Sequence, residues 1–169
     1  MARLSQQSSR HSTNDQGSQN QSRHFNRLVQ EAHAQCKLSI TIAAELAGLS
    51  PSYLCDLLAG RRYFIHLYRL KRLCTYVWRL DRPGSLLIFS ARIALEAKTQ
   101  RHLPVEFFWR IAEYPDLNSL ARAAHLSKSH VARILRNCRR PTYQSFAALA
   151  EAIGYKPAEI GTLFVALHR

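Results

Sequence analysis

Basic side chains gather in residues 122–140, which hold six Lys or Arg and no acid. If residues 128–136 form a helix, Ser129, Arg133 and Arg136 share one face, at i, i+4 and i+7. Lys and Arg donate hydrogen bonds to guanine O6 and N7 and to phosphate oxygens, and Ser can pair with any base. The candidate base contacts are Lys128, Ser129, His130, Arg133 and Arg136, and the candidate phosphate contacts are Arg139 and Arg140. The alternative for this segment is a solvated basic helix that binds no ligand. For His130, an exposed polar residue without a ligand is as well supported as a nucleic-acid contact.

The same pattern occurs earlier in the chain. Residues 44–62 (AELAGLSPSYLCDLLAGRR) align at a constant offset with residues 121–139 (ARAAHLSKSHVARILRNCR). In the first copy Asp56 takes the place of Arg133 and would repel phosphate, so we expect this copy to hold a nucleic-acid backbone rather than read bases. Its basic residues come later, at Arg61, Arg62, Arg69, Lys71, Arg72 and Arg79. A structural role, in packing against the second copy or in a dimer, is the alternative.

Helical periodicity surrounds both copies and predicts an all-α fold. Apolar residues recur at i, i+3, i+4 and i+7 in five segments on each side of a polar stretch at 98–103. We expect two tandem five-helix bundles, at 25–101 and 102–169, after a disordered Ser/Gln/Arg-rich tail at 1–24. The predicted N-caps are Ser39, Ser50, Asp116, Ser127 and Thr142, and Pro51 suits a first helical position. The periodic core positions of the last helix of the first bundle are Leu87, Ala91, Ala94 and Leu95, and Trp78 and Trp109 are expected to be core residues.

Composition narrows the class of protein. The 169 residues carry 24 Lys or Arg against 11 Asp or Glu, a net charge of +13, which favours a polyanionic partner. No apolar run is long enough to cross a membrane, and the N-terminus lacks the apolar region of a signal peptide, so a cytoplasmic location is expected. The four cysteines form no CxxC pair and are interpreted as buried free thiols, with no metal site. Paired carboxylates, nucleophile motifs and phosphate-binding loops are also missing, so no enzyme, cofactor or small-molecule substrate is predicted.

The second copy resembles the phage-repressor-like helix-turn-helix family, of the Cro and lambda-repressor or XRE type. The matching stretch is residues 117–160, LNSLARAAHLSKSHVARILRNCRRPTYQSFAALAEAIGYKPAEI. Members usually have Gly in the turn between the two helices; the first copy keeps it as Gly48, whereas the second has His125, which would then be left-handed. Members also commonly begin the first helix with a phosphate-binding Gln, where this chain has Ile40 and Leu117.

The resemblance implies a sequence-specific, double-stranded DNA-binding transcriptional regulator of bacterial or phage type. The second bundle would read the major groove and the first would add backbone contacts through Arg61 and Arg62, or assemble the protein as a homodimer. Two alternatives remain open, namely a protein-interaction module such as an antitoxin or anti-repressor partner, and a DNA-targeting accessory of a recombination system. RNA binding is disfavoured because the aromatic platform that it commonly uses is not evident in the sequence.

Overall fold

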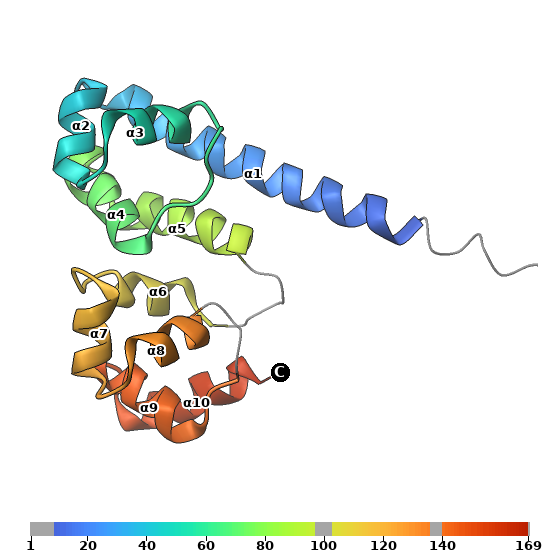
Figure 1. The fold of residues 1–169 in the computed structure, drawn as a ribbon, viewed down its shortest axis with the longest axis vertical. Coiled ribbons are helices and arrows are strands. Elements are labelled where there is room, and N and C mark those ends of the chain that lie inside the picture. Colours follow the sequence, from blue (N-terminus) through green and yellow to red (C-terminus); the bar gives the residue numbers. More distant parts are fainter. Residues whose placement is uncertain (1–8, 97–102, 136–139, 169) are drawn as a thin grey trace, which may run out of the picture.

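The computed structural model describes residues 9–96, 103–135 and 140–168, and this part of the chain is helical, without strands. None of its helices is both long and apolar enough to cross a membrane. Most of the predicted junction between the bundles, at 98–103, lies outside the described residues, since only Leu103 of it is described. In Figure 1 the helices form two groups, an upper one from α1 to α5 and a lower one from α6 to α10. The upper helices are α1 (Ser9–Gln35), α2 (Ile40–Ala47), α3 (Pro51–Leu58), α4 (Leu67–Arg72), which continues as a π-helical turn η1 (Leu73–Val77), and α5 (Arg82–Glu96).

The upper group closes around a core of aliphatic and aromatic side chains. Large, fully buried ones come from five different segments: Phe25, Leu54, Ile65, Leu70 and Phe89. The predicted caps are confirmed: Ser39 accepts from the Ile42 amide, and Ser50 accepts from the Tyr53 amide. These bonds satisfy amides that a helix leaves unpaired at its first turn, so the sequence itself fixes where α2 and α3 begin.

The lower group has a second core. Its helices are α6 (Val105–Ile111), α7 (Leu117–Ala123), α8 (Lys128–Leu135), α9 (Tyr143–Ala152) and α10 (Pro157–Leu167). Phe107 stacks on Phe146 at a centroid distance of 5.7 Å, and the two rings lie beside Leu120, Ile134 and Leu149. The predicted caps Asp116, Ser127 and Thr142 each accept a hydrogen bond from the amide three residues later.

Helix α6 belongs to both cores. Phe107, Phe108 and Ile111 pack in the lower core, whereas Trp109 and Ala112 pack in the upper one. The Trp109 ring meets Phe89 of α5 edge to face at 4.7 Å, and its 8% exposure confirms the predicted core position. Because α6 is covered on two sides, the two groups pack against each other and are not separate domains joined only by a linker.

The expected disordered tail at 1–24 is described only in part, because residues 1–8 lie outside the described residues. From Ser9 on, the structure differs from the expectation: α1 begins there, so residues 9–24 continue the helix that Phe25 and Val29 anchor to the core. Once a helix is anchored, each added residue costs far less than nucleation, which lets a polar segment extend it. Residues 17–24 are exposed apart from the half-buried Ser22, in keeping with their polar composition.

Two further expectations need correction. Leu87 is 52% exposed, because α5 turns Ile88, Phe89 and Arg92 toward its neighbours instead. Cys74 is buried, and burial raises the pKa of its thiol to about 12, but Cys36 and Cys55 are only half-buried. All three are free thiols, and Cys138 lies outside the described residues.

Two helix pairs, α2–α3 and α7–α8, correspond to the two copies of the repeat, and the turns within them share one backbone conformation. Gly48 has φ +68° and His125 has φ +52°, which confirms the expected left-handed histidine. A side chain with a Cβ is strained there, because the Cβ approaches the following carbonyl oxygen. A Cβ at Gly48 would meet its nearest neighbour, an Arg72 guanidinium nitrogen, at an ordinary 3.5 Å, so backbone strain is the only penalty there.

We expect His125→Gly to raise, and Gly48→Ala to lower, the free energy of unfolding by about 0.5–1 kcal/mol each. The first change relieves left-handed strain, and the second introduces it at the equivalent turn. Urea unfolding of the two variants beside the wild type measures both effects. Changes of the same sign in both variants would contradict this interpretation.

A second prediction concerns His33, whose Nδ1 accepts a hydrogen bond of 3.3 Å from Trp78 Nε1. Burial lowers the pKa of His33 below its ordinary 6.5. The unfolded chain therefore takes up this proton first, and stability should fall as the pH drops from about 6.5 through the lower folded pKa. His33→Gln should flatten the dependence of urea unfolding on pH between about 7 and 5. His24→Gln, at an exposed position on the same helix, is the matched control for the loss of an imidazole, and equal flattening in both variants would contradict the assignment to His33.

Candidate nucleic-acid interface

The described residues of the predicted reading helix have the expected orientation. Lys128, Ser129 and Arg133 of α8 are exposed, while Val131 and Ile134 are 0% and 2% exposed in the lower core. His130 is intermediate: its ring is partly covered, and its Nε2 is buried without a hydrogen-bond partner. The outward rim of α8 is therefore polar and cationic, and the apolar side chains beneath it keep it from rotating.

The remaining predicted contacts of this segment divide between described and undescribed residues. Arg140 is described and exposed, just before α9. Arg136 and Arg139 lie outside the described residues. Arg122, at the end of α7, adds a further exposed cation to this side of the lower group.

Acidic side chains do not offset these cations within the helix pair itself, because residues 117–135 contain none. The nearest acid in sequence, Asp116, caps α7, and its hydrogen bond from the Ser119 amide lowers the pKa of its carboxyl group. Glu113 pairs with Lys71 at 3.2 Å, and Glu106 pairs with Arg82. These carboxylates are thus engaged at a helix start or between the two groups.

The first helix pair presents a different surface. On α3, Ser52 is exposed and Asp56 is half-buried in the place that Arg133 takes on α8. The Asp56 carboxylate accepts from Arg61 Nε at 2.8 Å and lies 3.6 Å from Arg62 Nε. Asp56 therefore does more than repel phosphate: it holds both predicted contact arginines just beyond the end of α3.

Helix α1 positions this end of α3. Asn26 donates to the carbonyl oxygens of Leu57 and Leu58 at 3.1 Å, and Gln30 donates to Leu58 at 2.7 Å. These bonds satisfy carbonyls that the last turn of a helix leaves free. Gly60 follows with φ +69°, and a Cβ there would meet Asn26 side-chain atoms at 3.2 Å. The turn that aims Arg61 and Arg62 outward is consequently fixed by tertiary contacts.

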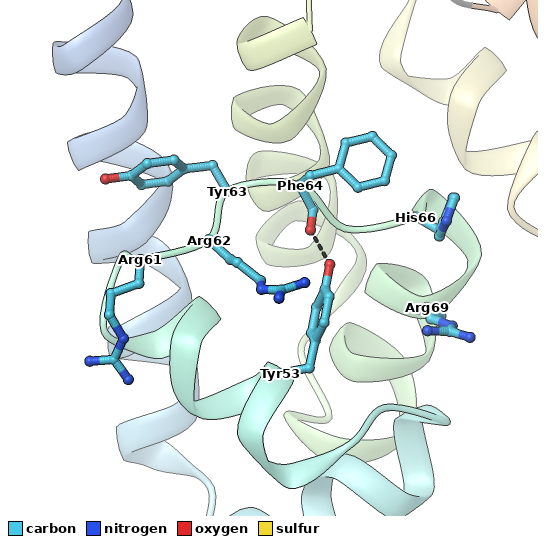
Figure 2. Close-up of a pocket in the computed structure, with 7 residues that line it drawn as sticks. All are labelled: Tyr53, Arg61, Arg62, Tyr63, Phe64, His66 and Arg69. Carbon is cyan, nitrogen blue, oxygen red and sulfur yellow. Dashed lines mark hydrogen bonds between the residues drawn. The ribbon is translucent and has the colours of Figure 1, made fainter.

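Beyond this turn the structure shows a feature that sequence reasoning missed. Residues 62–66 form a non-helical connection between α3 and α4, and a surface hollow of about 530 Å³ lies beside it. We call it the aromatic–arginine hollow; it is drawn in Figure 2 and lined by Tyr53, Arg61, Arg62, Tyr63, Phe64, His66 and Arg69. The sequence feature that could have predicted this hollow is the mixture of basic and aromatic residues in RRYFIHLYR, residues 61–69.

Lys71 does not join the expected backbone-holding surface. Its Nζ lies 4.6 Å from the centroid of the Trp109 ring and donates to the Trp109 carbonyl oxygen at 3.4 Å. Lys71 also forms an ion pair with Glu113, which lies just after the end of α6. This lysine therefore fills the structural role that was the alternative for the basic residues of the first copy.

Comparison of the chain with protein families, with curated proteins and with solved structures finds no match. Among the side chains that the structure describes, no three His, Cys, Asp or Glu residues come together as a metal site.

The pairing of Asp56 with two arginines leads to a third prediction. Asp56→Asn should free Arg61 and Arg62 for an anionic ligand and raise the affinity for duplex DNA at low salt by about two- to fivefold. Fluorescence anisotropy with a labelled duplex measures the change. The matched control is Glu31→Gln, which breaks an exposed ion pair with Arg27 on α1. An equal gain in both variants would show that net charge alone is responsible.

Proposed function

We propose that the chain is a sequence-specific, double-stranded DNA-binding transcriptional regulator of bacterial or phage type, without enzymatic activity. The observation that carries this proposal is the outward face of α8. Lys128, Ser129 and Arg133 are exposed there above a buried apolar face, and no acid lies in the helix pair. In the proposed assignment, α2–α3 and α7–α8 are tandem helix-turn-helix pairs of the lambda-repressor type, and α8 enters the major groove.

The chemistry of such a helix suits base-edge recognition. Arg133 and Lys128 donate hydrogen bonds in the geometry that guanine O6 and N7 accept, and Ser129 can donate or accept. Ser127 caps the helix through the His130 amide, and the positive end of the helix dipole favours a phosphate close by. Arg140, exposed before α9, would bind the backbone and set the register without selecting a sequence.

The first helix pair would contribute affinity more than selectivity. Asp56 occupies the position equivalent to Arg133, and a carboxylate there opposes a phosphate backbone. The side chains of Arg61 and Arg62 remain 66% and 56% exposed despite their ion pairs with Asp56, so both can reach a phosphate. A cytoplasmic location, where DNA is accessible, belongs to the same proposal.

A double substitution on α8 tests the assignment. Lys128→Ala with Arg133→Ala should abolish most of the preference for a site selected in vitro over a scrambled duplex, since each good base contact contributes about 1–3 kcal/mol of discrimination. The control is Lys37→Ala with Lys156→Ala, which removes the same charge from exposed positions elsewhere. It should weaken the binding of both duplexes to the same extent. Mobility-shift titrations of the two duplexes measure the ratio.

Two results would contradict the proposal. One is an unchanged preference in the α8 double variant, which would remove α8 as the reader. The other is a wild-type protein that enriches no sequence from a random duplex library.

A further inference from the structure

The aromatic–arginine hollow has the size and the lining of a binding site. Its volume of about 530 Å³ lies within the range of small-ligand pockets. Three of its seven lining residues are arginines, three are Tyr or Phe, and none is acidic. It is formed by α3, the connection that follows it and α4, so it is separate from the α8 surface and goes beyond the function proposed above.

Two aromatic rings at the hollow are open to solvent. Tyr63 is 40% exposed and Phe64 is 50% exposed, although large aromatic side chains gain most from burial. The two residues are adjacent in the non-helical connection between α3 and α4. Figure 2 shows this arrangement, with the Tyr63 ring and the Phe64 ring pointing away from each other. The segment thus offers two separate faces on which a flat group could stack.

The segment is held in place from below. Tyr53 on α3 donates a hydrogen bond to the Phe64 carbonyl oxygen. Arg92, 1% exposed on α5, donates to the Ile65 carbonyl oxygen at 3.1 Å, and its guanidinium carbon lies 4.9 Å from the centroid of the Phe64 ring. A ligand therefore meets a surface that is already ordered, which reduces the entropy lost on binding.

Positive charge surrounds these rings. Arg61 and Arg62 together face one carboxylate, that of Asp56, and Arg69 lies at the other side of the hollow, with its guanidinium carbon 5.8 Å from the Tyr68 ring. Figure 2 shows Arg62 directed toward Tyr53, and its guanidinium carbon lies 4.9 Å from the centroid of that ring. From residue 57 to residue 80 the sequence contains no acid, so the local field favours an anion.

Aromatic faces beside guanidinium groups are the combination that binds unpaired nucleotides, with bases stacked on rings and phosphates held by cations. We propose that the aromatic–arginine hollow binds single-stranded nucleic acid, with Tyr63 and Phe64 stacking on bases and Arg62 and Arg69 holding phosphates. Two separate rings suit two bases of one strand, whereas a free mononucleotide would use a single ring. The chemistry that is shared by both ligands is an unpaired base that carries a phosphate.

Binding of a fluorescein-labelled oligothymidylate to the full chain tests the proposal, with an abasic strand of equal length and charge as the comparison. The wild type should bind oligothymidylate about tenfold or more tightly than the abasic strand, because only the first can stack. Equal affinity for the two strands would overturn the proposal, since it would leave only charge attraction. Because this comparison uses the wild type, it does not depend on how any variant folds.

Variants then place the site. Tyr63→Leu with Phe64→Leu should reduce the affinity for oligothymidylate about tenfold, whereas Tyr76→Leu, at a 63% exposed position outside the hollow, should leave it unchanged. Circular dichroism and thermal melting verify that both variants fold. Equal affinity of all three proteins would overturn the assignment to the hollow.

Two further arms separate the ligand sources and the two proposals. Displacement of the strand by free thymidine monophosphate at equal nucleotide concentration would show that the hollow binds a free nucleotide, and would overturn the proposal that it binds a strand. The Tyr63 and Phe64 double variant should keep its preference among duplex sites, and the Lys128 and Arg133 double variant should keep its base-dependent binding of oligothymidylate. Loss of that base dependence in the Lys128 and Arg133 variant would overturn the proposal that the hollow is a site separate from the α8 surface.

Discussion

The arrangement of the whole molecule depends on α6 being buried from two sides. Trp109 inserts among upper-group side chains at 4.7 Å from Phe89, while Phe107, two residues earlier, stacks in the lower core. A short helix with apolar residues on two sides is stable only when both of those sides are covered. Removing either group would expose one side of α6 to water. The two helix pairs consequently keep a fixed relation to each other, and so do the surfaces they carry.

The two repeats show how one backbone plan supports unlike surfaces. Both pairs have a left-handed turn residue, at Gly48 and His125, followed by a serine cap on the next helix. A difference in charge lies at one outward position, where α3 has Asp56 and α8 has Arg133. The carboxylate binds the arginines that follow it in the chain, whereas the arginine stays exposed. Local electrostatics, rather than the fold, separates the two surfaces.

Features that depend on neighbours in sequence were predictable, and features that depend on distant contacts were not. The caps and the outward direction of Arg133 follow from turn chemistry and helix periodicity, and the left-handed His125 was expected from the resemblance to a family that has Gly in this turn. The exposure of Leu87 was missed because α5 contacts both α1 and α6, which periodicity alone cannot reveal. The aromatic–arginine hollow was missed for the same reason, since it needs α3, the connection and α4 to meet in space. The burial of Arg92, which supports the connection, has an equally non-local cause, since residues 64 and 65 are among its partners.

The rigid junction at α6 also bears on avidity. When two binding surfaces are joined by a flexible tether, the second contact forms at an effective concentration that falls as the tether lengthens. Here Lys71 and Trp109 close the junction by direct contact, so no tether length enters. A polymer that spans both surfaces gains the full benefit of the second contact only if its own shape matches the fixed separation. If both proposed surfaces bind one polymer, the packing of this one tryptophan makes the distance between them a constraint on the shape of that polymer.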